Sequence, residues 1–325
     1  MKKIRIGVIG AGSMGRNHVR ILSTEKGPFE FAGFYDADQN RAAEIAKQFS
    51  VTALPSVTAL LEQVDAVTIA APSSLHKELA LEAARHGVHA LVEKPLALTS
   101  EDAEEISRAF AQAGLILAVG HVERYNPVVA ELCKLVRHEK ILALEVRRYS
   151  PYNGRITDAD VVQDLMVHDI DLVCNVLMDQ KLPEVFSAGE SVVSGKLDYV
   201  QSLMRFEDGT VASVGASRVT QSKVREIVVH TDHSYILADL LTRSLSVQRN
   251  TNLVIDEGKE SAYRQDSVTQ KIFVPMVEPL RMELVDFVDH VMSGTEPAAN
   301  GPAACRTIRI AETVIAQAGK QPALR

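Results

Sequence analysis

The sequence predicts an α/β fold: a doubly wound parallel sheet, followed by an α+β domain with a large, mostly antiparallel open sheet. From residue 4 to about 120, short apolar runs alternate with amphipathic segments, which is the strand–helix rhythm of a parallel sheet. A glycine-rich turn joins the first apolar run to the first helical segment. After about residue 140, runs with period-two alternation follow one another, and the pair Asp208-Gly209 marks a hairpin between two of them.

Length and composition suit a globular protein of two domains. The chain has 325 residues, 46% of them hydrophobic and 24% charged. We place the domain boundary after residue 122, giving domains 1–122 and 123–325. A net charge of −7 gives no basic surface for nucleic acid, and no apolar run reaches the ~20 residues of a membrane span. Three widely spaced cysteines without metal-type spacing indicate reduced thiols and a cytoplasmic protein.

The first strand, predicted at residues 4–9, leads straight into a Gly-x-Gly-x-x-Gly loop and then a helix. The loop consists of Gly10, Ala11, Gly12, Ser13, Met14 and Gly15. This order of elements is the fingerprint of a dinucleotide-binding Rossmann domain. The first glycine permits the tight turn, the second leaves room for a pyrophosphate, and the third lets the helix pack closely. The alternative is an ordinary glycine-rich connection.

Asp36 closes the second predicted strand, residues 29–35, and follows Gly15 at the distance expected for a carboxylate that binds a ribose hydroxyl. A carboxylate there repels a 2′-phosphate, so the sequence favours NAD over NADP. Arg41 lies close enough to keep NADP open. The alternative for Asp36 is a turn or helix-capping aspartate.

Two further strand ends carry polar residues toward the predicted cofactor edge. The strand at residues 66–70 is followed by cofactor-loop candidates Ala71, Pro72, Ser73 and His76. The strand at residues 88–92 is followed by Glu93-Lys94-Pro95, where the proline keeps Lys94 out of the helical region. Lys94 is thus the candidate cation beside the cofactor, with a surface lysine as the alternative.

Oxidation of an alcohol requires a base for the hydroxyl proton and a donor or cation at the oxygen. Asp164, His168 and Asp171 are spaced four and three residues apart within the predicted helix 164–178, among apolar neighbours. An ionisable stripe in so apolar a segment is expected to face a cavity. His168 is the candidate base, and Asp164 orients it or binds the same hydroxyl. The alternatives are a structural Asp–His pair and a metal site that includes His121, although we predict no metal.

A third group of candidates follows the last strand of the first domain, residues 115–119. Arg124, with His121 and Tyr125, can bind a phosphate or carboxylate of the substrate. The alternative for Arg124 is an ion pair at the domain boundary.

Taken together, these motifs resemble the Gfo/Idh/MocA oxidoreductases, named after glucose–fructose oxidoreductase, inositol dehydrogenase and a rhizopine-catabolism protein. The resemblance rests on residues 10–15, 93–95 and 124–127, on the Asp164-x-x-x-His168 pair with Asp171, and on residues 278–284. It implies that Lys94, Asp164 and His168 form the catalytic group, that Glu93 helps to place the cofactor, and that Pro95 follows a cis peptide bond. It further implies dimers or tetramers formed through the open face of the second sheet.

Residues 120–127 and 164–171 are most similar to the branch of this family that oxidises sugar nucleotides. The sequence therefore predicts an NAD-dependent enzyme that oxidises a secondary hydroxyl of a sugar or sugar nucleotide. An inositol or free-sugar dehydrogenase and a non-catalytic NAD-binding sensor are the alternatives. The remaining predicted helices are 40–49, 60–64, 75–86, 99–112, 279–292 and 302–318, and the remaining strands are 141–149, 199–206, 211–217, 224–231 and 235–239.

Overall fold

The structure is a computed structural model that describes residues 3–152, 159–178, 182–256 and 262–319. These residues form two compact units, one of residues 1–125 with 278–309, the other of residues 126–277 with 310–325. The sequence predicted a second domain continuous from residue 123 to 325. Instead, the chain returns to the first unit with residues 278–309, because the helix in that segment packs its apolar side into the core of the first unit.

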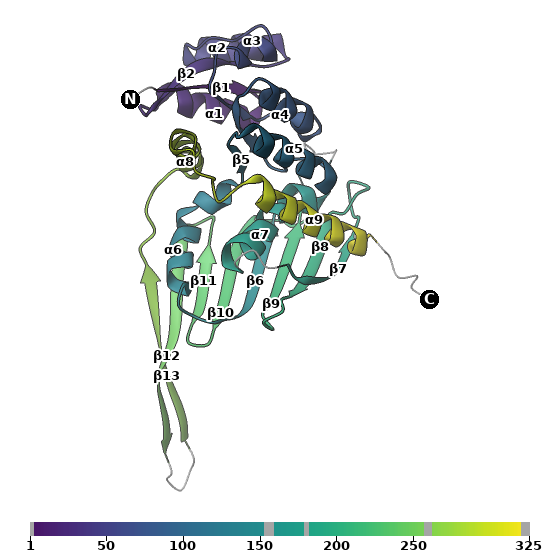
Figure 1. Cartoon of the computed structure of the whole chain (residues 1–325). Helices are drawn as coiled ribbons and strands as arrows, with labels where there is room; N and C mark the ends of the chain where they lie inside the picture. The colour runs from purple at the N-terminus through teal and green to yellow at the C-terminus, as the bar shows by residue number, and fades with distance from the viewer. Residues whose placement is uncertain (1–2, 153–158, 179–181, 257–261, 320–325) are drawn as a thin grey trace. The chain divides into compact units, whose positions relative to one another are not determined.

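The first unit contains a five-stranded parallel sheet in the order β2-β1-β3-β4-β5 (Figure 1). The strands are β1 (Ile4–Ile9), β2 (Phe29–Tyr35), β3 (Ala66–Ile69), β4 (His89–Glu93) and β5 (Leu117–Gly120). An isolated parallel bridge between Phe34 and Ala53 continues the sheet beyond β2. Since all the strands run in one direction, the segments that follow them emerge at one edge of the sheet. These segments contain the glycine loop, Asp36, Ala71, Lys94 and His121.

The helices of the first unit begin and end largely where local signals predict. They are α1 (Ser13–Thr24), α2 (Gln39–Phe49), α3 (Val57–Leu61), α4 (His76–Arg85), α5 (Ser100–Ala113), α8 (Pro279–Ser293) and the start of α9 (Gly301–Ala318), with short turns η1 (Ser73–Leu75) and η2 (Val122–Tyr125). Thr99 caps α5 by accepting from Asp102 N, and Gly114 ends it in the left-handed conformation. The helix predicted at 60–64 begins earlier in the structure. The Ser56 hydroxyl caps the N-terminus of α3 by accepting a hydrogen bond from Ala59 N.

The second unit contains an eight-stranded sheet in the order β13-β12-β11-β10-β6-β9-β8-β7. Among the described strand pairs of this second sheet, only β6 and β9 are parallel, so the predicted mostly antiparallel character is confirmed. The strands are β6 (Ile141–Tyr149), β7 (Glu184–Glu190), β8 (Tyr199–Arg205), β9 (Val211–Ser217), β10 (Val224–Thr231), β11 (Tyr235–Asp239), β12 (Ser244–Asp256) and β13 (Ala262–Ile272). The sequence reading did not assign β12 and β13.

One face of this sheet is covered by helices, as Figure 1 shows for α6 and α7. The helix α6 (Pro127–Val136) was not predicted; Asn126 caps it and Pro127 begins it. The predicted helix 164–178 is present, but only α7 (Val167–Asp171) is α-helical. Wider π-type turns, η3 (Val162–Met166) and η4 (Leu172–Leu177), flank it. Such turns within helices are often found at functional sites.

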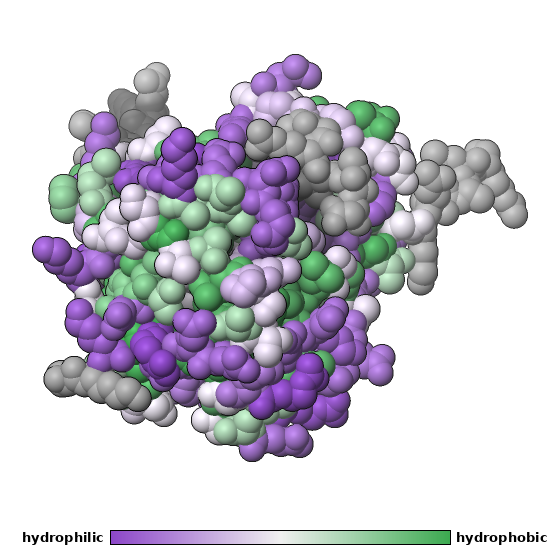
Figure 2. All heavy atoms as spheres, turned by 90° about the horizontal axis from the view of Figure 1, so that it is seen from above, coloured by the Kyte–Doolittle hydropathy of each residue, from purple (hydrophilic) through white to green (hydrophobic). Residues whose placement is uncertain are grey.

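Polar and apolar residues are interspersed on the face of the molecule seen in Figure 2. Among the residues that the structure describes, no helix is both long and apolar enough to cross a membrane.

Candidate functional site

The glycine loop after β1 has the conformation that a dinucleotide requires. Gly10 has a φ of +85°, and a Cβ there would lie 2.7 Å from the Ala71 backbone nitrogen. A Cβ on Gly15 would lie 1.9 Å from the Gly10 carbonyl oxygen, so only glycine lets α1 approach the turn. A Cβ on Gly12 would meet nothing within 4 Å, and no side chain caps the first turn of α1. The space over Gly12 and the uncapped N–H groups of α1 therefore fit a pyrophosphate.

Asp36 lies at the end of β2 and is tied to the glycine loop. Its carboxylate accepts from Ala11 N at 2.7 Å and from Asp38 N at 2.8 Å. The Arg41 guanidinium lies 3.3 Å from both carboxylate oxygens of Asp36. Asp36 is 5% exposed, whereas Arg41 is exposed to solvent. The predicted ribose-binding carboxylate thus has a fixed orientation, and the arginine that kept NADP open is paired with it.

His76 joins the loops that follow β3 and β4. Its Nε2 lies 2.9 Å from the Ala71 carbonyl oxygen and its Nδ1 lies 2.8 Å from the Pro95 carbonyl oxygen. Burial lowers the pKa of His76, while the two carbonyls partly offset that effect. Its buried ring therefore lies within hydrogen-bond distance of a carbonyl oxygen from each of the two loops. In the same loop Pro72 is exposed and Ser73 is half-buried.

Lys94 follows β4 directly and is half-buried. The Lys94–Pro95 peptide bond is cis, as the family resemblance implied. The Lys94 backbone N–H donates to Glu93 Oε2 at 3.2 Å, and Glu93 Oε1 lies 3.0 Å from His18 Nε2 in α1. The backbone of Lys94 is therefore held by a carboxylate that also contacts the helix of the glycine loop.

The residues after β5 bind other parts of the first unit. The Arg124 guanidinium donates to the Ala298 carbonyl oxygen at 2.8 Å. The Tyr125 hydroxyl donates to Asp286 in α8 at 2.7 Å, and burial, then this carboxylate, raise the pKa of Tyr125. His121 is buried. Sequence reasoning assigned these residues to the substrate and missed that Arg124 and Tyr125 bind the returning segment 278–309.

In the second unit, Asp164 and His168 are half-buried, and Asp171 is buried. Asp171 accepts from the Asn175 side-chain amide at 2.9 Å, a bond within the helical segment. His168 lies in α7 and Asp164 in the π-type turn η3, so the predicted stripe spans a change in helical pitch.

Sequence reasoning missed a buried ion pair beside His168. Asp169 is 1% exposed and accepts from Arg148 Nε at 2.9 Å and from Arg148 NH2 at 2.8 Å. Arg148 is on β6, on the same side as the buried residues Leu144 and Val146. That alternation was the available signal: an arginine at an inward position of a strand requires a buried anion.

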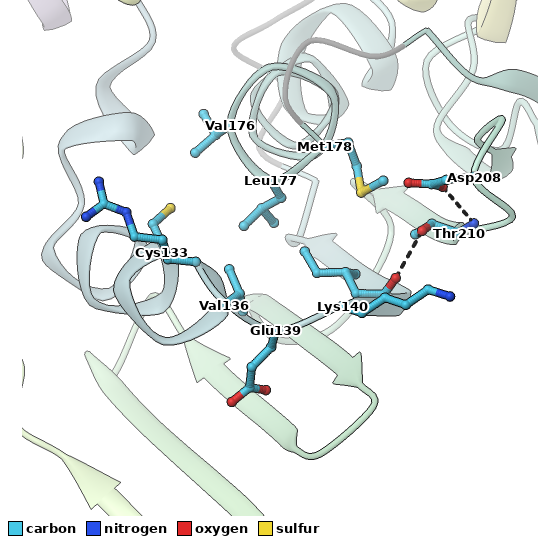
Figure 3. A pocket seen from close by; sticks show the side chains of 11 residues that line it. Cys133, Val136, Glu139, Lys140, Val176, Leu177, Met178, Asp208 and Thr210 are labelled. Carbon is cyan, nitrogen blue, oxygen red and sulfur yellow. Dashed lines mark hydrogen bonds between the residues drawn. The ribbon is translucent and has the colours of Figure 1, made fainter.

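A pocket of about 730 Å³ lies elsewhere in the second unit, between α6, η4 and the start of β6 (Figure 3). Its walls combine apolar side chains, such as Val136 and Leu177, with charged ones such as Lys140, and none of the predicted site residues lines it. Within the described part of the chain, no group of three or more His, Cys, Asp or Glu side chains could hold a metal ion.

Comparison with known proteins agrees with this arrangement of elements. Residues 4–121 match the family model of the GFO/IDH/MocA oxidoreductases with an NAD-binding Rossmann fold, and residues 143–236 match the model of the GFO/IDH/MocA C-terminal domain. UDP-N-acetylglucosamine 3-dehydrogenase from Acidithiobacillus ferrooxidans is 36% identical over 76% of this chain and 77% of its own length. A solved structure of that enzyme superposes with a TM-score of 0.88 over 98% of both chains at 31% identity. Myo-inositol 2-dehydrogenase from Thermotoga maritima is 26% identical over 92% of this chain and 91% of its own.

Proposed function

The chain belongs to the GFO/IDH/MocA family of oxidoreductases, and we propose that it is an NAD-dependent dehydrogenase that oxidises the 3-hydroxyl of UDP-N-acetylglucosamine. The observation that carries this proposal is the 36% identity to a UDP-N-acetylglucosamine 3-dehydrogenase, with structural agreement over 98% of the chain. The inositol dehydrogenases among the relatives are less similar over comparable lengths. The related alternative is oxidation of an inositol or a free sugar.

The proposed chemistry assigns one role to each unit. His168 takes the proton of the hydroxyl, and Asp164 orients His168 or binds the same hydroxyl. The Lys94 ammonium stabilises the negative charge that develops on the oxygen. When NAD⁺ is bound, it supplies the acceptor for the hydride.

The geometry around Asp36 supports NAD rather than NADP. Its carboxylate is fixed by Ala11 N and Asp38 N, so it cannot turn away from a ribose. A 2′-phosphate placed there would meet this negative charge. Arg41 is already paired with Asp36 and has only part of its charge to offer a phosphate.

The decisive experiment measures NADH formation by the purified protein with UDP-N-acetylglucosamine, N-acetylglucosamine and myo-inositol. We expect turnover with the sugar nucleotide. The variants Lys94→Ala and His168→Ala should each lower kcat by about 10²-fold or more, because each removes a group that acts at the reacting oxygen. NADH binding, followed by its fluorescence, should persist in both variants.

Other outcomes separate the alternatives. Turnover of myo-inositol but not of the sugar nucleotide would support the inositol-type reading. NADH binding with no turnover of any of these compounds would favour the sensor. Full activity in Lys94→Ala or His168→Ala would contradict the mechanism.

We also propose that the protein is cytoplasmic. Copies of the chain associate through the face of the second-unit sheet opposite its helices. Phe186 on β7 and Leu203 on β8 lie directly opposite each other in register and are 54% and 47% exposed. Tyr199, on the same side of β8, is 38% exposed. An apolar sheet surface of this kind is typical of an interface.

Sedimentation should detect dimers or tetramers in the wild type, and Leu203→Glu should shift them toward monomers. A monomeric wild type would refute this proposal.

A further inference from the structure

A buried polar cluster in the first unit lies next to the backbone N–H of Lys94. It consists of His18 from α1, Glu93 from the end of β4, and Glu283 from α8, with exposures of 0%, 7% and 1%. Two carboxyl groups and an imidazole are expensive to remove from water, so their burial needs a reason beyond packing. The mechanism proposed above does not use His18 or Glu283.

Glu93 connects the helix of the glycine loop to the backbone of Lys94. Its Oε1 lies 3.0 Å from His18 Nε2, and its Oε2 accepts from Lys94 N at 3.2 Å. A Cβ on Gly120, at the end of β5, would lie 2.9 Å from Glu93 Oε2. Because glycine stands at this position, the Glu93 carboxyl can lie between β5 and the start of the Lys94 loop.

Glu283 is buried in α8, and neither of its carboxyl oxygens has a hydrogen-bond partner. Burial, followed by repulsion from Glu93 and Asp286, raises the pKa of Glu283 well above its ordinary value. Two carboxyl groups that repel each other in a buried site do not both ionise. Glu283 therefore favours its protonated form, whereas both Glu93 oxygens lie within hydrogen-bond distance of His18 or the Lys94 N–H.

Among the described residues, the charged groups around α8 have partners other than Glu283: the Arg124 guanidinium in η2 donates to the Ala298 carbonyl oxygen. Tyr125 in η2 donates to Asp286 rather than to Glu283. The two arginine pairs of α8, Arg20 with Glu278 and Arg281 with Glu25, involve partly exposed side chains and are already matched.

We propose that His18 and Glu283 are positioning residues for Lys94 that act through Glu93: His18 fixes the Glu93 carboxyl group, and Glu283 adds no second negative charge beside it. This inference deepens the proposed function, since it rests on Lys94 being the cation at the reacting oxygen. A small displacement of such a group can cost a large factor in rate.

The test compares His18→Gln with His18→Leu, alongside Glu283→Gln and Lys94→Ala. A glutamine amide can still donate to Glu93, whereas leucine cannot. We expect His18→Leu to lower kcat about tenfold or more, with KM for NAD⁺ and for the sugar nucleotide within about threefold. His18→Gln should recover most of kcat, and Glu283→Gln, which is neutral like the acid, should keep it. The infrared band of a protonated carboxylic acid should persist in the wild type at pH values just above those at which exposed carboxyl groups ionise, and it should be absent from Glu283→Gln.

The outcomes distinguish this inference from the proposed function. Wild-type kcat in His18→Leu, with Lys94→Ala inactive, would overturn the inference alone. Equal losses in His18→Leu and His18→Gln would also overturn it, because the hydrogen bond would then be irrelevant. A fully active Lys94→Ala would overturn the proposed function, and the infrared band would still decide whether Glu283 is the acid. Absence of that band would overturn the charge assignment within the cluster.

Discussion

Glu283 should make the stability of the protein depend on pH in a way that a single isosteric substitution removes. The change is Glu283→Gln, which keeps the size of the side chain and its neutral state but cannot ionise. In the folded protein the pKa of Glu283 is well above the ordinary 4.5 that holds in the unfolded chain. Between those two values the folded state carries one proton that the unfolded state lacks.

The sign and size of the effect follow from linkage. The stabilisation associated with the raised pKa is fully present below about pH 4.5, and it is lost as the pH rises through the folded-state value. One proton corresponds to about 1.4 kcal/mol of unfolding free energy for each pH unit. Relative to the wild type, Glu283→Gln should therefore gain about 1.4 kcal/mol per pH unit across that interval.

The assay is urea unfolding of wild type and variant at a series of pH values from about pH 5 upward, followed by the circular dichroism of the helices. The matched control is Glu278→Gln at the start of the same helix, where the carboxylate is exposed and paired with Arg20. That variant should show no comparable gain with rising pH. A difference between Glu283→Gln and wild type that does not change with pH would refute the reasoning, because Glu283 would then be ionised in the folded protein.

Two further predictions concern the cofactor edge and the helix of His168. Asp36→Asn keeps an acceptor for Ala11 N but removes the charge. It should lower the preference in kcat/KM for NAD⁺ over NADP⁺ about tenfold, or about 1.4 kcal/mol, and an unchanged ratio would contradict the assignment of Asp36. Arg148→Met removes the cation that pairs with the buried Asp169 carboxylate. It should lower the free energy of unfolding, measured in urea, by about 3–5 kcal/mol. The double variant Arg148→Met/Asp169→Leu should be less destabilised than this single variant, and an equal or larger loss would contradict the role of the buried charge.

Much of the first unit could be predicted from the sequence because its signals are local. A strand, a turn and a helix that are consecutive in the chain also lie side by side in a parallel sheet, so the glycine loop and Asp36 could be located from spacing alone. The position of Lys94 could likewise be predicted from the strand that precedes it. The alternating strands β6, β9, β10 and β11 were predicted at the bounds that the structure has.

The errors occurred where packing overrode local pattern. The periodicity of residues 164–178 indicates a helix, but it does not distinguish α from π turns, which depend on how the segment packs on β6 and β9. The pattern of α8 likewise indicates a helix without saying which core receives it. The side chains Leu284 and Phe287 pack into the core of the first unit, and this explains why the chain returns there.

The sequence by itself determined the order of strands and helices, the loop for a dinucleotide and the identity of the groups able to perform proton and charge transfer. Only the tertiary structure decided that Glu283 is buried without a hydrogen-bond partner, that His18 contacts Glu93, and that Arg148 neutralises Asp169. The physical reason is that the state of a buried charge depends on all the groups around it, and these groups come from segments far apart in the chain. Periodicity and motif spacing report only on neighbours along the sequence, so they identify a candidate group without fixing its protonation or its orientation.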